Sequence, residues 1–425
     1  MLNRLNLSLI MLVILSPGLR AAEFNYNVQA IMAYYENINR VVVPVDSEMS
    51  ESVRGGINIT ENSAVIDAAI EASYEILNYE NNQVDDQSVG YLNSNVLWKI
   101  SPRQFEWFIS DVFTQTTIDT LASDTPSNRQ DANAISTGPN YIIRFNNRHS
   151  ISFEIRYSDF YYEIVDYDNN RLRGAIILDY SMNSSTALSA NMYSQSVYFD
   201  NAVLNPDYTR NDYFVGMNYR KGLNTIELEL GSTFIEFENQ TKFDDLRYSF
   251  LMNNQRTSNA SLQLHFARHL HDTSSSLLEL TSNGINQNNI GSSTSDIFTN
   301  DEALITYNRE FRRGDFALSL FSIATDYHQQ NNLDQCEKGF SFLRTIDMPR
   351  GSQLSFEARY SETQFDNLSP VRIDDNYIYR AGFSYAAGRN TRLNIEIESD
   401  ENESSAIANN YEDLSVMLSL VYSSS

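Results

Sequence analysis

The sequence has one cysteine, a shortage of basic residues and no long apolar run, and each shortage excludes a class of protein. Cys336 is the single cysteine among 425 residues, so no disulfide within the chain stabilises it. With 30 basic against 55 acidic side chains, it lacks the clustered Lys and Arg that capture phosphates, so we expect no nucleic-acid partner. No stretch of about 18 apolar residues follows the amino terminus, which excludes a helical membrane protein.

The amino terminus predicts a removable secretory signal peptide over residues 1–22. Arg4 supplies the positive start, an apolar run follows from Leu7, and Ala21 and Ala22 are small residues suited to cleavage. Removing Arg4 and Arg20 leaves 28 basic and 55 acidic residues, a formal charge of −27. Residues 23–425 show no shift of composition that would mark a linker, so we expect one domain there.

Alternation of apolar and polar side chains is the strongest pattern. In residues 64–79 the apolar Ile66, Ile70 and Ile76 share one parity, while Asp67, Glu71 and Glu75 share the other. An extended strand points successive side chains to opposite faces, so such a strand has one oily and one wet face. The same pattern recurs in residues 151–158, 226–231, 354–361 and 377–385.

Tight turns alternate with long polar connections, the arrangement of an outer-membrane barrel. We therefore predict an all-β fold, a transmembrane antiparallel up-and-down β-barrel of about 20 strands, with 18 to 22 allowed. A water-soluble β-sandwich or β-helix also alternates, but a sandwich core has no use for apolar faces on so many strands. The longest connections are expected at residues 40–52, 80–88, 119–136, 201–210, 283–300, 329–337 and 399–409.

The last segment has the form of a closing strand. Apolar residues occupy alternate positions and end in an aromatic close to the terminus, a pattern similar to the signal by which bacterial outer-membrane barrels are recognised for assembly. The three serines at 423–425 extend beyond that pattern. The candidate assembly signal comprises Leu414, Val416, Leu418, Leu420 and Tyr422.

The polar residues at alternate positions of each strand are expected to face the lumen, and any pore function would depend on them. Both signs of charge occur on it, which predicts a mixed polar lining and not a filter of one sign. Many of these charges are also expected to pair across neighbouring strands. The candidate lumen-lining residues are Asp67, Glu71, Glu75, Lys99, Arg144, Glu154, Arg156, Arg173, Asp179, Arg220, Glu227, Glu229, Glu357, Arg359 and Arg380.

Aromatic and histidine side chains are further candidates on the same face. Rings there either stack on sugars or pack against an inward-folded segment, and the candidates are Phe108, Phe214, Phe321, Phe340 and Phe342. His265, His269 and His271 share one parity, but His265 and His269 lie about 13 Å apart along a strand, too far to share one metal ion. No hydrolase, phosphate-loop or Cys/His motif occurs, so we expect no enzyme, no catalytic residue, no cofactor and no metal site.

Several segments give the chain a resemblance to a known family. They are Tyr35-Glu36-Asn37-Ile38, the segment 124–130 with Thr125, Pro126, Ser127, Asn128 and Arg129, Gly138-Pro139-Asn140-Tyr141, Arg156-Tyr157 and Tyr161-Tyr162-Glu163. With these the chain resembles outer-membrane barrels found with exosortase and PEP-CTERM exopolysaccharide systems of Gram-negative bacteria. The resemblance implies a barrel encoded near machinery for exporting a surface polysaccharide, and it implies no catalytic residue.

The segment from Thr125 to Arg129 is a candidate family loop. Pro126 disfavours helix at Thr125, and Ser127 and Asn128 can hydrogen-bond nearby backbone, so a fixed turn is expected. Such a turn either narrows the mouth of the pore or is an ordinary ordered surface loop.

Together these observations predict a porin-like channel, or an accessory component of exopolysaccharide export, in the outer membrane of a Gram-negative bacterium. A non-conducting structural or adhesion scaffold is the alternative, and an outer-membrane hydrolase is a third. The expected partners are outer-membrane lipid and lipopolysaccharide, the barrel assembly machinery, and polysaccharide or export components. Divalent cations are expected to bridge the acidic loops to anionic lipid.

Overall fold

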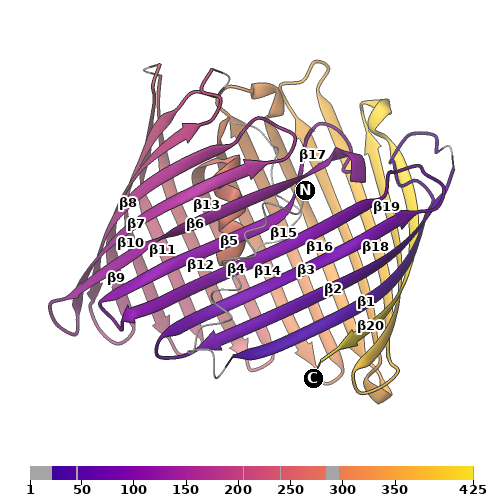
Figure 1. Ribbon diagram of the computed structural model, residues 1–425, viewed down its shortest axis with the longest axis horizontal. Coiled ribbons are helices and arrows are strands. Elements are labelled where there is room, and N and C mark those ends of the chain that lie inside the picture. The colour runs from indigo at the N-terminus through magenta and orange to yellow at the C-terminus, as the bar shows by residue number, and fades with distance from the viewer. Residues whose placement is uncertain (1–21, 45, 204, 240, 284–295, 425) are drawn as a thin grey trace.

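The computed structural model is a closed barrel of 20 antiparallel strands (Figure 1). It describes residues 22–424 except 45, 204, 240 and 284–295, so residues 1–21 of the predicted signal peptide lie outside the described residues. Each strand pairs with the next along the chain, and β1 pairs with β20. The predicted fold class is therefore confirmed. Within the described residues, no helix is long and apolar enough to cross a membrane.

The strands are 13 to 16 residues long. They are β1 (Glu23–Tyr35), β2 (Glu48–Asn62), β3 (Ile66–Tyr79), β4 (Gln87–Ser101), β5 (Phe105–Thr117), β6 (Arg129–Arg144), β7 (His149–Tyr162), β8 (Asn169–Ser181), β9 (Thr186–Phe199), β10 (Tyr208–Lys221), β11 (Asn224–Phe237), β12 (Lys242–Thr257), β13 (Ala260–Asp272), β14 (Ile297–Phe311), β15 (Gly314–Tyr327), β16 (Gln335–Asp347), β17 (Gln353–Phe365), β18 (Arg372–Ala386), β19 (Thr391–Ser404) and β20 (Tyr411–Ser423).

Helical segments occur only in the connections of the described chain. They are η1 (Pro126–Asn128), α2 (Thr273–Asn283), η3 (Asn331–Leu333), η4 (Pro349–Gly351) and η5 (Ile407–Asn409). The connections that follow odd-numbered strands leave the wall at one end, and the longest join β1 to β2, β5 to β6 and β13 to β14. Those that follow even-numbered strands lie at the other end and are short, as at 222–223 and 258–259. In outer-membrane barrels the short turns face the periplasm and the long loops face outward.

The ring closes where the first strand meets the last. β1 and β20 pair from Asn27↔Ser423 to Tyr35↔Ser415. Beyond the strand ends, the backbone N–H of Glu36 donates to the carbonyl of Leu414 at 3.0 Å, and that of Ser424 donates to the carbonyl of Tyr26 at 2.8 Å. Among the described residues, every strand therefore has a neighbouring strand on both sides, as a wall surrounded by lipid requires.

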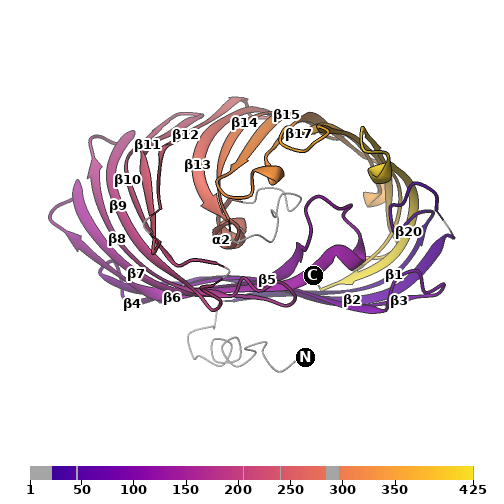
Figure 2. The same ribbon diagram turned by 90° about the horizontal axis from the view of Figure 1, so that it is seen from above.

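The α2 helix shows which face of the wall is interior. Figure 2 shows α2 within the ring of strands. Its Leu277 packs in one cluster with Ala132, Ala134, Phe160 and Tyr162, so these wall residues face inward. The pairing registers extend this assignment from strand to strand, because residues directly opposite each other on neighbouring strands lie on the same face of the wall.

The outer face is apolar in its middle and polar toward the long-loop end. Leu230 and Val215 lie opposite each other on β11 and β10 and are 53% and 58% exposed. Near the long-loop ends of β16 and β17, Lys338 forms an ion pair with Glu362 at 2.7 Å on this same face. A strand needs about 9–11 residues to span a bilayer. The longer strands here therefore extend beyond the apolar band.

A charge placed in that band should strongly destabilise the barrel. We expect Leu230→Arg to cost about 2–4 kcal/mol of folding free energy in a lipid bilayer, because the guanidinium would enter hydrocarbon. The matched control is Asn218→Arg on the inner face, where Asn218 lies beside Glu227. Urea titrations in lipid vesicles measure both. Equal costs for the two variants would contradict the assignment of the faces.

Candidate pore and its inward-folded segments

The register places the charged residues predicted to line the lumen on the inner face. They are Asp67, Glu71 and Glu75 on β3, Lys99 on β4, Arg144 on β6, Glu154 and Arg156 on β7, Arg173 and Asp179 on β8, Arg220 on β10, Glu227 and Glu229 on β11, Glu357 and Arg359 on β17, and Arg380 on β18. Their part in conducting a solute stays a prediction.

Many of these charges are paired on the wall. Lys99 Nζ lies 2.6 Å from Asp67 Oδ2, and Arg380 Nη1 lies 3.0 Å from Glu357 Oε2 and also bonds Glu398. Arg359 pairs with Glu337 at 3.0 Å. At these positions adjacent strands carry opposite charges, so the wall is polar and part of its charge is neutralised by ion pairs across the strands.

Aromatic rings on the inner face hold several of these guanidinium groups. The Arg156 guanidinium lies 4.7 Å from the ring centre of Phe108, and that of Arg247 lies 4.4 Å from Phe214. Arg359 lies over Phe321 at 5.2 Å. These stacked pairs make Phe108, Phe214 and Phe321 part of the lining, as the sequence predicts.

Phe340 and Phe342 do not share that face, and the prediction that they line the lumen is wrong. On β16 the positions that face inward are those of Glu337, Gly339 and Ser341. Phe340 points outward, is 41% exposed and lies beside Tyr360 with ring centres 5.9 Å apart. Large apolar side chains belong on the lipid-facing side of a barrel and small or polar ones on the inside.

The connection between β13 and β14 enters the lumen as α2. Asp272 ends β13 and caps the helix, because its Oδ1 accepts the backbone N–H of Ser275 at 3.0 Å. Leu277 then packs on the inner wall of β6 and β7 and is 1% exposed. The helix contacts β4, β5 and β6 as well as β13, so it occupies part of the bore (Figure 2).

A buried polar network fixes the start of α2, and we call it the anchor network. Arg171 on β8 donates Nη1 and Nη2 to the two carboxylate oxygens of Asp272 at 3.0 and 2.6 Å. Its Nε donates to Asn169 at 2.8 Å, and Asn169 and Tyr162 each donate to Ser274 Oγ at 3.0 Å. Arg171 and Asp272 are 3% and 7% exposed in their side chains, so the pair is fully enclosed.

A second inward segment is the connection 118–128, which contains the candidate family loop. Thr125 is buried, Pro126 to Asn128 form η1, and the Asn128 amide donates to the carbonyls of Asp119 and Ser123 at 2.8 and 3.1 Å. On the far wall Arg372 of β18 donates to the carbonyl of Leu121 at 2.6 Å. The segment therefore crosses part of the mouth and is held on the opposite wall.

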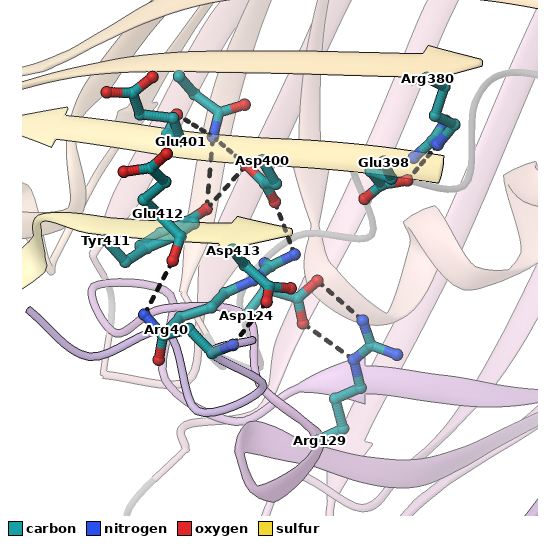
Figure 3. A network of polar contacts seen from close by, with 12 residues as sticks. Arg40, Asp124, Arg129, Arg380, Glu398, Asp400, Glu401, Tyr411, Glu412 and Asp413 are labelled. Carbon is teal, nitrogen blue, oxygen red and sulfur yellow. Dashed lines mark hydrogen bonds and ion pairs between the residues drawn. The ribbon is translucent and has the colours of Figure 1, made fainter. Parts of the chain in front are cut away.

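The connection 36–47 reaches the same part of the wall as the segment 118–128, through the side chain of Arg40. Arg40 Nη2 lies 2.7 Å from Asp400 Oδ2 on β19, and Tyr411 donates its hydroxyl to Asp400 Oδ1 at 3.2 Å. Asn37 fixes this connection, since its backbone N–H donates to Asp413 at 2.7 Å. Figure 3 shows Arg40 among these carboxylates, with Asp124 of the segment 118–128 beside it.

Asp124 and Arg129 clamp the two ends of η1. Arg129 donates Nε and Nη2 to the two oxygens of Asp124, both at 2.9 Å. Burial raises the pKa of the Asp124 carboxyl, but the hydrogen bond from Arg129 and the charges of Arg129 and Arg40 lower that pKa more. The pKa of Asp124 is therefore below its usual value of 3.8.

This lowered pKa predicts how the segment 118–128 responds to acid. A carboxylate with a lowered pKa stabilises the folded state above its unfolded pKa and loses that contribution as the pH falls through the folded pKa. We expect amide hydrogen exchange of residues 118–128, corrected for intrinsic rates, to be steady from neutral pH to about 4 and to accelerate below it. In Asp124→Asn the exchange should be fast throughout. Asp347→Asn, at the short-turn end, is the control, and an unchanged acid response in Asp124→Asn would contradict the clamp.

The three histidines lie on β13, with the ring centres of His269 and His271 5.6 Å apart. Across the described part of the chain, no group of three or more His, Cys, Asp or Glu side chains has an arrangement that could hold a metal ion. The expected bridging of acidic loops by divalent cations stays a prediction, to be measured as thermal stability with and without a chelator.

The candidate assembly signal lies along β20. Leu414, Val416, Leu418, Leu420 and Tyr422 all point outward and are between 37% and 49% exposed. They sit at the seam with β1, where the wall closes. Their recognition by assembly machinery stays a prediction.

The sequence did not single out the residues that hold the inward segments. Arg171, Asp272, Arg40 and Arg372 are the principal ones. Asp272 carried a local signal, because an Asp three residues before a Ser and just ahead of Leu277 has the form of a helix N-cap. The partners of these four residues lie far away in the sequence, as with Arg171 and Asp272, 101 residues apart.

Comparison with known proteins agrees with the architecture. No family model and no curated protein matches the sequence. Among solved structures, a variant of the ferric enterobactin receptor of Pseudomonas aeruginosa is 10% identical with a TM-score of 0.50, covering 95% of this chain and 81% of the receptor. The FrpB iron transporter of Neisseria meningitidis is 9% identical with a TM-score of 0.50, covering 96% of this chain and 83% of the transporter. The chain thus has the fold of an outer-membrane β-barrel.

Proposed function

We propose that this protein is a porin-like channel of a Gram-negative outer membrane, with a mouth narrowed by its own inward-folded segments. The observation that most supports this proposal is a closed wall whose inner face contains ion pairs. The helix α2 and the segment 118–128 fold into the lumen that this wall surrounds. A polar lining that holds water lets hydrophilic solutes pass, and the inward segments limit their size.

We further propose that the channel serves exopolysaccharide export. The support is the resemblance carried by Tyr35 to Ile38, residues 124–130 and Gly138 to Tyr141. Asn37 and Asp124 belong to those segments, and both take part in the contacts that hold the mouth. Lipopolysaccharide, the assembly machinery and export components are the partners that this proposal implies.

The alternative is a non-conducting scaffold, and the occupied bore is the observation that favours it. Planar-bilayer recording of the purified full-length protein separates the two. Discrete conductance steps are expected of the channel, and their complete absence would favour the scaffold. Deleting the gene and measuring surface polysaccharide tests the export role separately, and an unchanged amount would contradict that role.

A further inference from the structure

A polar cavity lies along the wall of β2 to β5, bordered by Asp124 of the inward segment 118–128 and by Arg129 at the start of β6. Its volume is about 460 Å³, and its lining includes Arg54, Glu75, Tyr91, Thr114, Asp124 and Arg129. A cavity of this size falls within the range of small-molecule sites in proteins. Arg54, Glu75, Tyr91 and Thr114 lie on the inner wall, Asp124 lies in the segment that narrows the mouth, and Arg129 is the first residue of β6.

Charge within this cavity is already balanced. Arg54 donates Nε to Glu75 Oε2 at 2.7 Å and also donates Nη2 to that oxygen, while Ser52 donates to Glu75 Oε1 at 2.5 Å. Arg129 uses Nε and Nη2 on Asp124 in the same way. An added anion or cation would have to compete with one of these two pairs, so the cavity does not favour an ion.

Hydrogen-bonding capacity nevertheless remains on the same groups. The side chains of Arg54 and Arg129 are each 44% exposed, and each guanidinium still has its Nη1 to offer an acceptor. The Asp124 carboxylate is 49% exposed and can accept further bonds, and Thr114 contributes a hydroxyl. The Tyr91 ring adds an apolar surface with a polar edge.

We infer that this cavity is a binding site for an uncharged saccharide at the mouth of the channel. Neighbouring hydroxyls of a sugar both donate and accept, which suits a surface of paired guanidinium and carboxylate groups. The apolar face of the sugar ring suits Tyr91. The inference rests on the proposed channel function, because a ligand reaches the cavity through the water-filled bore.

Saturation-transfer NMR on the detergent-solubilised full-length protein tests binding without requiring conductance. The probes are maltotriose, cellotriose, sodium gluconate and inorganic phosphate. We expect saturation transfer to at least one of the two neutral trisaccharides, and an affinity loss of about tenfold in Tyr91→Ala. Arg54→Gln should weaken binding as well, while Arg380→Gln, which alters a wall pair outside the cavity, should not.

The outcomes separate the site from the channel. Binding only of gluconate or phosphate, binding of no probe, or equal binding by wild type and both cavity variants would overturn the site. Heat-modified migration in gel electrophoresis shows that each variant is folded before it is compared. Conductance steps without saccharide binding would refute the site and leave the channel, whereas saccharide binding without conductance would refute the channel alone.

Discussion

Asp272→Ala is expected to lower the free energy of unfolding by about 3–5 kcal/mol, because it leaves the Arg171 guanidinium buried without its counter-ion. The same change removes the N-cap of α2, which adds about 1 kcal/mol. Asp272 both ends β13 and starts the helix inside the bore. The variant should therefore lose stability and also hold the inward segment less firmly. Urea unfolding followed by fluorescence measures the first effect, and single-channel conductance measures the second.

Two control variants test whether the loss of stability comes from the buried, unpaired charge of Arg171. Arg171→Met combined with Asp272→Leu removes both charges, so it should recover most of the loss in stability. Glu236→Ala breaks the exposed pair with Lys242, whose side chains are 55% and 66% exposed, and should cost less than about 1 kcal/mol. An Asp272→Ala variant as stable as wild type would show that the anchor network does not hold the helix.

Arg372→Ala is expected to raise the single-channel conductance by about twofold, because the segment 118–128 would lose its hold on the far wall. Arg372 reaches Leu121 from β18 and is itself held by Asp374 at its side. Arg350→Ala removes one exposed arginine at the short-turn end and should leave the conductance unchanged. The measurement is a planar-bilayer recording at neutral pH and fixed salt.

Two results would contradict this view of the mouth. One is an identical conductance for wild type and Arg372→Ala. The other is an equal rise in Arg350→Ala, which would indicate a general effect of charge. Amide hydrogen exchange of residues 118–128 in Arg372→Ala shows independently whether the segment has come loose.

The strands and their faces were predictable from the sequence because alternation is a local property. The parity that puts Glu227 and Glu229 inside and Leu228 and Leu230 outside can be counted along one strand. The wrong prediction for Phe340 and Phe342 of β16 departed from this count, because Gly339 and Ser341 are the small and polar residues that suit the inside. The cross-strand partner agrees with the count, since Phe340 lies opposite Tyr360 on the outer face.

The contents of the bore were not predictable in the same way. Whether a polar connection lies over the surface or folds inward depends on a partner across the barrel. Leu121 meets Arg372 from 251 residues away, and no periodicity brings those two positions together. The turn at Pro126 to Asn128 was predictable, because proline and asparagine act locally, but its place in the mouth depends on the distant wall.

The seam between β1 and β20 has a consequence for biogenesis. Residues near Tyr26 cannot satisfy their backbone groups toward the seam until Ser424, 398 residues further along the chain, is available to them. A polypeptide cut short before Leu414 would expose a bare edge to hydrocarbon at the seam. Truncated forms should therefore stay in the periplasm as substrates for proteases, and they should not appear in the membrane as smaller pores.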